Sequence, residues 1–399
     1  MNKPDTPKIN RIRKLMDEEN LDVLVVRLAE NVNFISGFFN VLGYACVVFP
    51  REAEPILIAT STEKAWYERG WVTDVRTFPI WDSKAVNAPQ ATHFGSNDHI
   101  NRFLKEIAAE KKFPAERVGY EGSFEFISPP VIVPEPVVPA EPSKRALREA
   151  WPQAELVDCT NLLNKARAIK TAYDIEKLRI VHDVTAFGLA AWEEACRNNA
   201  TEAEAGAAFQ AAVTAKGIGH KGALFAQGWP QVVSGLNTGE WVYKPSTQRR
   251  IENGDFVIIE LAVCVDGYYS DLTRTIVVGE PTKEQRRIFD LTYEAMQAGI
   301  EIVKPGVRAA ELDRVAKEVL GPDVKYCLTH FGHGLGWKYH EPYPTITNSS
   351  EHVLEEGHYF AFEPGIYVPG LGGSRHEENL VVTATGYENL SSVAPISIS

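Results

Sequence analysis

The chain of 399 residues has little cysteine and no long apolar run. Its five cysteines are scattered, odd in number and without CxxC spacing, which excludes a disulfide framework and favours a reducing compartment. No apolar stretch approaches the roughly 18 residues of a transmembrane helix. The charged start of the chain also lacks the apolar core of a signal peptide. We therefore expect a cytoplasmic location and no membrane partner.

The chain also has no excess of basic over acidic residues. The chain has 53 acidic and 41 basic residues, a net charge of −12. Surfaces that bind nucleic acids need a basic footprint, so we expect no nucleic-acid partner. The hydrophobic content of 44% and charged content of 24% are ordinary for a globular protein. At about 100–200 residues per domain, the length indicates two or three domains.

The first part of the chain alternates short apolar strands with helices, which predicts an α/β domain. The expected strands cover residues 21–26, 44–49 and 55–58, and the expected helices cover 8–20 and 101–112. Six prolines in segment 129–142 predict an extended insertion on this domain, because proline fixes φ and removes a backbone donor.

The second part has a different pattern, and we place the domain boundary near residue 165, giving domains 1–165 and 166–399. Turn-rich strands follow residue 253. The expected helices cover residues 172–198, 201–216, 283–302 and 308–320.

A β-hairpin is predicted at the Asp-Gly turn of residues 266–267, between two β-rich runs. A two-residue loop places Ala262 opposite Asp271 and Glu260 opposite Thr273. Side chains alternate faces along a strand, so Glu260 and Asp271 share one face as diagonal neighbours. Two acids aimed into one region need a proton, a cation or water between them. The alternative is a pair of solvated acids on an outer face.

A glycine-rich segment at 330–342, HFGHGLGWKYHEP, carries two histidines of interest. His333 lies among three glycines, which permit close backbone approach. His340 follows seven residues later, beside an acid. Each histidine is either a ligand or catalytic group, or a structural residue in a glycine-rich loop.

Two further acids interrupt or begin hydrophobic strands. Glu363 lies within the run YFAFEPGIY at 359–367, and Glu377 precedes an apolar strand in the segment at 372–383. Burying a carboxylate is costly unless it is paired. Either acid alone is also compatible with an exposed position.

Taken together, these segments offer oxygen and nitrogen ligands and no thiolate. Such a set suits two divalent ions that carboxylates bridge about 3.5–4 Å apart. Carboxylates suit Mn²⁺ and Mg²⁺, and an added imidazole extends the choice to Fe, Co and Zn. The candidate metal ligands are Glu260, Asp271, His333, Glu363 and Glu377.

The motifs DGYYSDLTRT, FGHGLG with HEP, FEPGIY and SRHEENLVV, in this order, resemble the catalytic domain of the creatinase/prolidase/methionine aminopeptidase superfamily (M24). The likeness covers nearly the whole chain. It implies an α+β fold in which a pita-bread domain, a curved antiparallel sheet covered by helices, follows a smaller α/β creatinase-type domain. It also implies a metal-dependent hydrolase and a homodimer.

The resemblance includes two departures from the family pattern. The family has Asp where this chain has Glu260, which is one methylene longer. In the family, the segment that corresponds to the one beginning at Ser234 has a substrate-contacting histidine eight residues after its serine. This chain has Val242 at that position, between Trp241 and Tyr243. The resemblance implies two divalent ions, with Mn, Co, Zn or Fe as the candidates. Because Glu260 departs from the family pattern, a site with one ion or with no ion is also left open.

The resemblance also implies roles in the reaction. Glu363 takes a proton from the attacking water, and His340 stabilises the oxyanion. Glu260 is a third catalytic candidate, as a nucleophile or base. The candidate substrate-binding residues are Trp241, Val242, Tyr243, Trp337 and Arg375. The alternative for the three aromatic residues is ordinary core packing.

The expected activity is hydrolysis of an amide-type C–N bond, as in an Xaa-Pro dipeptidase or aminopeptidase with short-peptide substrates. The departures at Glu260 and Val242 leave a second enzyme open, a creatinase-like or ectoine-hydrolase-like hydrolase of a small nitrogen compound. A non-catalytic binding relative is a third interpretation, which the retained acids disfavour.

Overall fold

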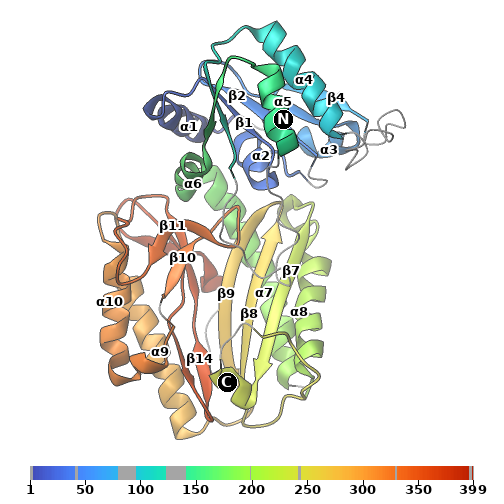
Figure 1. Ribbon diagram of the computed structural model, residues 1–399. Coiled ribbons are helices and arrows are strands. Elements are labelled where there is room, and N and C mark those ends of the chain that lie inside the picture. Colours follow the sequence, from blue (N-terminus) through green and yellow to red (C-terminus); the bar gives the residue numbers. More distant parts are fainter. Residues whose placement is uncertain are drawn as a thin grey trace. The chain divides into compact units, whose positions relative to one another are not determined.

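The computed structural model of the chain describes residues 3–40, 44–79, 96–122, 141–197, 199–240, 244–328, 330–394 and 398 (Figure 1). The chain divides into two compact units, and the division falls between Arg167 and Ala168. Three of the predicted substrate-binding residues, 241–243, lie outside the described residues, as does most of the predicted proline-rich insertion. No described helix is both long enough and apolar enough to cross a membrane.

The first unit is a mixed sheet with helices, in agreement with the predicted α/β pattern. Its described strands form a sheet in the order β4-β3-β2-β1-β5-β6. Its elements are α1 (Thr6–Glu18), β1 (Val23–Val26), α2 (Ala29–Ser36), β2 (Cys46–Pro50), β3 (Ile56–Thr60), α3 (Lys64–Tyr67), β4 (Asp74–Phe78), α4 (Ser96–Lys111), β5 (Arg117–Tyr120), α5 (Glu141–Ala150), β6 (Glu155–Asp158) and α6 (Thr160–Ala168).

Strands β1, β2 and β3 of this sheet are continuous apolar runs because they are covered on both faces. All four residues of β1 are buried, and so are all five of β2 and β3. Strands β1, β5 and β6 run parallel, whereas β2 pairs antiparallel with β1 and β3. Buried residues of α4 and α5, such as Leu104, Ile107 and Leu147, pack against this sheet.

The second unit combines long helices with antiparallel strands. Its elements are α7 (Ala172–Arg197), α8 (Glu202–Gly217), β7 (Ala226–Ser234), β8 (Phe256–Val265), β9 (Tyr268–Val277), α9 (Lys283–Glu301), α10 (Ala309–Leu320), β10 (Gly332–Gly334), β11 (Glu341–Ile346), β12 (Tyr359–Phe362), β13 (Gly365–Val368), β14 (Gly372–Arg375), β15 (Glu378–Val382) and β16 (Tyr387–Asn389). The helices begin and end close to the predicted positions.

One sheet of this unit contains β7, β8 and β9, with α7 and α8 packed beside it (Figure 1). The predicted hairpin is confirmed: Ala262 lies opposite Asp271, and Glu260 lies opposite Thr273. Both turn residues have positive φ, 48° at Asp266 and 85° at Gly267, which explains the Asp-Gly sequence. Strand β7, which the sequence pattern did not reveal, pairs with β8 along its whole length.

The other strands form a sheet in the order β11-β10-β12-β15-β16 and a separate ribbon of β13 and β14. Helices α9 and α10 lie on this side of the unit (Figure 1). A buried apolar core joins these helices to the strands through residues such as Met296, Leu312, Phe360 and Leu380. This core fixes β10, β12 and β15, the strands that carry or adjoin the predicted His333, Glu363 and Glu377.

Candidate metal centre

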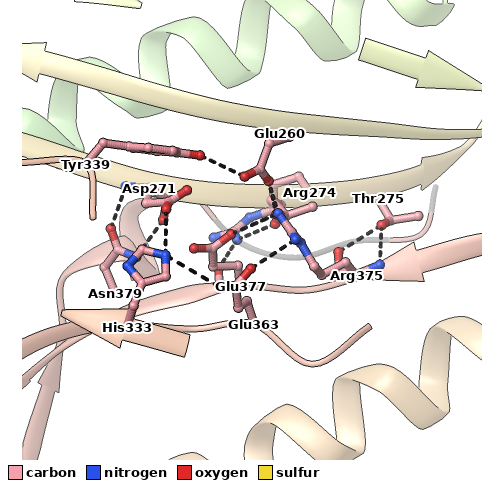
Figure 2. Close-up of polar contacts among 11 residues, drawn as sticks. Glu260, Asp271, Arg274, Thr275, His333, Tyr339, Glu363, Arg375, Glu377 and Asn379 are labelled. Carbon is pink, nitrogen blue, oxygen red and sulfur yellow. Dashed lines mark hydrogen bonds and ion pairs between the residues drawn. The ribbon is translucent and has the colours of Figure 1, made fainter. Parts of the chain in front are cut away.

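Residues from four separate segments of the second unit meet in one buried acid cluster (Figure 2). Glu260 on β8 and Asp271 on β9 are each 1% exposed. Glu363 follows β12 directly, and Glu377 lies between β14 and β15. Both of these side chains are buried too. The five predicted ligands, His333 on β10 among them, are therefore close in space although up to 117 residues separate them in sequence.

The imidazole of His333 points toward two of the acids. Its Nε2 lies 3.3 Å from Oδ2 of Asp271 and 3.6 Å from Oε1 of Glu363. Its Nδ1 lies 2.9 Å from the carbonyl oxygen of Gly334, which accepts a hydrogen bond from it. In the neutral ring this bond assigns the proton to Nδ1 and leaves the Nε2 lone pair facing the carboxylates. This is the tautomer that a metal-ligating histidine needs.

Three carboxylate oxygens in the cluster have no hydrogen-bond partner among the described residues. They are Oδ1 of Asp271, Oε1 of Glu363 and Oε1 of Glu377, and all three atoms are buried. An unpartnered buried acceptor is expensive, so native structures rarely keep one without a reason. Three of them beside a histidine lone pair form a site with excess negative potential.

The pKa values of Asp271 and Glu377 reflect this crowding of negative charge. Burial, followed by the charges of Glu260 and Glu363, raises the pKa of Asp271 well above its usual value. Burial, followed by the charges of Asp271 and Glu363, raises the pKa of Glu377 in the same way. A bound cation would compensate these charges directly, so that the carboxylates would no longer need protons.

Arg375, from β14, supplies the positive charge within the cluster (Figure 2). Its guanidinium is fully buried, pairs with Glu260, and lies 2.9 Å from Oε2 of Glu363 through Nη1. Its Nε donates to the hydroxyl of Thr273 at 2.7 Å. Burial alone would lower the pKa of Arg375, but the neighbouring acids, Glu260 first, raise it well above its usual value.

Glu260 is bonded more completely than the other acids. Its Oε1 accepts a hydrogen bond from the Tyr339 hydroxyl at 2.8 Å. Its Oε2 accepts one from the Thr273 hydroxyl at 2.5 Å and also contacts Arg375. Thr273 lies 2.7 Å from Oε2 of Glu377 as well, but its single proton serves one carboxylate at a time.

The other predicted catalytic residue, His340, lies beside this cluster. Its ring centroid is 4.1 Å from that of His333 and 4.4 Å from that of Tyr339. Burial, followed by the electrostatic effect of the neighbouring His333 and His330, lowers the pKa of His340 far below its usual value. His340 is therefore neutral near pH 7 and offers a hydrogen bond without adding charge.

Trp337, predicted to bind substrate, is only 2% exposed. Its ring packs against Tyr268 at 5.4 Å, and the ammonium of Lys170 lies 5.3 Å from its centroid. Its backbone N–H donates to Glu341, which also pairs with Lys170 at 3.1 Å. These contacts are those of a buried core residue, the alternative that the sequence left open, and its role with substrate stays a prediction.

Asn379 supports Asp271 from behind, and the sequence analysis did not single it out. Its side-chain oxygen accepts from the Asp271 N–H at 3.1 Å, and its side-chain nitrogen donates to the Asp271 carbonyl at 2.6 Å. The hydroxyl of Tyr359 donates to the same Asn379 oxygen at 3.1 Å. The only signal in the sequence is that Asn379 follows Glu377 by two residues, at the start of the strand that Glu377 precedes.

An aromatic wall, Trp229 with Tyr269 and Tyr339, adjoins the acids and was also missed. Trp229 lies opposite Ala262, which lies opposite Asp271, so all three share one face of the sheet. Its ring stacks on Tyr269 with a centroid distance of 6.3 Å, and both side chains are partly exposed. Extending the hairpin register to a third strand would have found Trp229.

The geometry fits a metal ion at one end of the cluster. Ligand atoms of Asp271, His333 and His340 lie within 4.8 Å of one another there, and Glu363 lies 3.6 Å from His333. Hard oxygen ligands with imidazole suit Mn, Fe, Co or Zn. We call these residues the ligand set: Asp271, His333, Glu363 and Glu377. Glu260 fits less well, because each of its oxygens already has a protein donor.

Comparison with known proteins places both units in an established context. The family model described as metallopeptidase family M24 matches residues 176–384, and the model described as creatinase/prolidase N-terminal domain matches residues 8–169. The two matches together confirm the predicted fold class, a pita-bread domain preceded by a creatinase-type domain.

Named relatives are similar over different shares of their length. An Xaa-Pro dipeptidase of Lactobacillus delbrueckii subsp. lactis is 26% identical over 395 residues, which is 95% of each chain. An Xaa-Pro dipeptidase of Pyrococcus furiosus is 42% identical over 148 residues, which is 37% of this chain and 42% of that enzyme. The crystal structure of the prolidase from Pyrococcus horikoshii OT3 matches with a TM-score of 0.75 and 24% identity, covering 98% of this chain and 99% of that one.

Proposed function

Because this chain belongs to metallopeptidase family M24, we propose that it is a metal-dependent hydrolase that cleaves the amide bond before proline in short peptides, as an Xaa-Pro dipeptidase or aminopeptidase. The observation that carries this proposal is the ligand set, in which the lone pair of His333 faces Asp271 and Glu363 beside oxygens that have no hydrogen-bond donor among the described residues. The names of the relatives support the choice of substrate.

The ligand set would hold the divalent ion, with Mn, Co, Zn or Fe as the candidates. Such an ion supplies Lewis acidity, which activates water near neutral pH and polarises a carbonyl group. The number of ions depends on whether Glu260 joins the ligands.

We assign the proton transfer from the attacking water to Glu363. One of its oxygens is anchored by Arg375 at 2.9 Å, while the other has no hydrogen-bond partner among the residues that the structure describes and is available to a proton. Neutral His340, beside His333, would donate a hydrogen bond to the oxyanion that develops on the substrate. Glu260 would position its neighbours, because donors hold both of its oxygens and disfavour a nucleophilic role.

We assign the proline ring of the substrate to the aromatic wall. Trp229 and Tyr269 present stacked, partly exposed rings on the face that carries Asp271. A compact apolar ring packs well on such a surface. Trp241, Val242, Tyr243, Trp337 and Arg375 remain the sequence-based candidates for further substrate contacts.

The test is hydrolysis of matched peptides by the full chain. We expect an Xaa-Pro dipeptide to be cleaved with Mn²⁺ or Co²⁺ present and to be spared after chelation. The same dipeptide with alanine in place of proline is the control for specificity, and an Xaa-Pro tripeptide separates an aminopeptidase from a dipeptidase. Absence of cleavage of every proline peptide, with any of these ions, would contradict the proposal.

One observation favours the second enzyme that the sequence left open. Glu260 replaces the family aspartate and is paired with Arg375, so the chemistry at that end of the cluster differs from that of a standard family member. Creatine and cyclic amidines such as ectoine therefore belong in the same assay. Their hydrolysis in place of peptides would identify a hydrolase of small nitrogen compounds.

We also propose the homodimer and the cytoplasmic location that the sequence analysis expected. Light scattering on the purified chain tests the first, since a dimer has twice the monomer mass of 44.3 kDa. Cell fractionation tests the second.

A further inference from the structure

Glu260 differs from the other acids of the cluster because protein donors hold both of its oxygens. Tyr339 bonds to one at 2.8 Å, and Thr273 bonds to the other at 2.5 Å beside Arg375. An ion that coordinates Glu260 has to displace at least one donor. Displacing Arg375 breaks a buried ion pair, which has a cost even though the guanidinium keeps Glu363 and Glu377 as acidic neighbours.

The guanidinium of Arg375 reaches three of the four acids. Besides Glu260 it lies 2.9 Å from Glu363 and 3.7 Å from Glu377. Arginine keeps its positive charge at every accessible pH, so this cation is permanent. Because it belongs to the chain, it competes with any free ion at a high effective concentration.

A second ion would have to bind directly beside this guanidinium. Glu260, Asp271 and Glu377 bring ligand atoms within 4.8 Å of one another, which by itself suits an ion. Arg375, however, contacts two of these three residues. A divalent ion there would lie against a fixed positive charge in a poorly screened interior.

At the His333 end of the cluster, ligand atoms of Asp271, His333 and His340 lie within 4.8 Å of one another, and the ion pairs of Arg375 go to other residues. Oδ1 of Asp271 has no hydrogen-bond partner among the described residues, and Nε2 of His333 faces Asp271 with its lone pair. Glu363 and Glu377 contact Arg375 as well, but within the described residues each keeps one oxygen that no donor holds. One ion bound there would gain ligands and displace no donor.

We propose that the chain binds a single divalent ion, through the ligand set, and that the guanidinium of Arg375 takes the place of a second ion. This inference rests on the proposed function, which requires a metal ion, and goes beyond it in fixing the number of ions. It also gives Glu260 a role other than that of a ligand: together with Thr273 it holds the guanidinium in place.

The experiment measures metal content and not activity. The full chain is stripped with a chelator, loaded with Mn²⁺, passed through a desalting column, and analysed by mass spectrometry of the metal and by electron paramagnetic resonance. We expect about one Mn²⁺ per chain with an uncoupled six-line spectrum. Two Mn²⁺ per chain with an exchange-coupled spectrum would overturn the inference and leave the proposed function intact. If the chain retains no Mn²⁺, and parallel samples loaded with Zn²⁺ or Co²⁺ retain no metal either, both the inference and the proposed function are overturned.

Two variants test the part played by Arg375. Arg375→Ala removes the guanidinium and frees the adjacent oxygens of Glu260, so we expect a second Mn²⁺ and the appearance of a coupled spectrum. Arg375→Lys keeps a cation and is the matched control, for which we expect one Mn²⁺. A folded Arg375→Ala protein that still binds one Mn²⁺ would overturn the role given to Arg375. If the alanine variant does not fold, the measurement on the unaltered chain still decides the number of ions.

Discussion

The two units of the chain bury carboxylates in opposite ways. In the first unit Glu121 is 3% exposed, and it accepts hydrogen bonds from the N–H groups of Arg27 at 2.8 Å and Leu28 at 3.0 Å and from the side chain of Asn31 at 2.8 Å. These donors lie at the start of α2, where backbone N–H groups favour an anion. Glu121 is thus a structural acid, satisfied within the chain.

In the second unit Asp271, Glu363 and Glu377 are buried as deeply, yet each keeps an oxygen without a donor in the part of the chain that the structure describes. Burying a charge is expensive in both units. The first unit offsets part of this cost with its own hydrogen bonds, whereas the second leaves carboxylate oxygens to be compensated by a ligand from outside. The difference separates acids that stabilise a fold from acids that bind an ion.

The largest expected effect is the loss of activity when the ligand set is broken. Asp271→Ala and His333→Ala should each lower kcat/KM more than about 100-fold, because even residues that only support metal ligands cost 10–100-fold. Steady-state hydrolysis of an Xaa-Pro dipeptide measures this. Glu121→Gln, which alters the satisfied acid, is the control and should change kcat/KM little. Unchanged turnover in both alanine variants would refute the assignment of the ligand set.

A second expected effect is that a metal ion stabilises only the second unit. An ion that binds the folded state alone at 100 times its Kd adds about 2.7 kcal/mol. Hydrogen exchange with and without Mn²⁺ should therefore show slower exchange in peptides from β10, β12 and β15. Peptides from β1 and β5 are the internal control. Equal protection of both units, or of neither, would contradict the comparison.

A smaller effect concerns pH. Burial is the main cause that raises the pKa of Glu121 from 4.5 to about 7, against the lowering effect of its hydrogen bonds. Between these values the folded state keeps a proton that the unfolded chain has released, so stability falls as the pH rises from 4.5 through 7. The loss amounts to about 2 kcal/mol between pH 5 and 8.

Chemical unfolding of the first unit at pH 5 and pH 8 measures this loss, with Glu121→Gln as the partner variant. The amide does not titrate, so the variant should lack this part of the pH dependence. If both proteins lose stability equally over this range, Glu121 is ionised throughout and the pKa assignment is wrong.

Much of this fold and of the cluster could be predicted from the sequence because the signals are local. The Asp-Gly turn fixes the register of β8 and β9, and the register alone puts Glu260 and Asp271 on one face. Helix periodicity marked α7, α8, α9 and α10 closely. Helix α4 begins at Ser96, five residues before the predicted start, because its first turn carries no apolar pattern.

The positions of Arg375 and Asn379 could not be predicted, because they depend on contacts between distant segments. Arg375 was expected to meet substrate, and nothing in the run SRHEEN indicates that its side chain turns toward Glu260 on β8. Asn379 bonds to the backbone of Asp271, 108 residues away. Such contacts follow from the packing of β14 and β15 against β9, which a linear pattern does not encode.

The smallest expected effect sharpens the comparison by changing the site without touching its acids. Trp229→Ala removes the outer part of the aromatic wall but leaves every carboxylate contact in place, so metal content should stay the same while KM for an Xaa-Pro dipeptide rises. Aromatic contacts are worth about 0.5–1.5 kcal/mol, which corresponds to roughly a 2- to 10-fold change. Trp229→Phe keeps a stacking ring and should restore most of the binding. A fall in metal content or in kcat alone would show that Trp229 supports the cluster, and would move the substrate contact elsewhere.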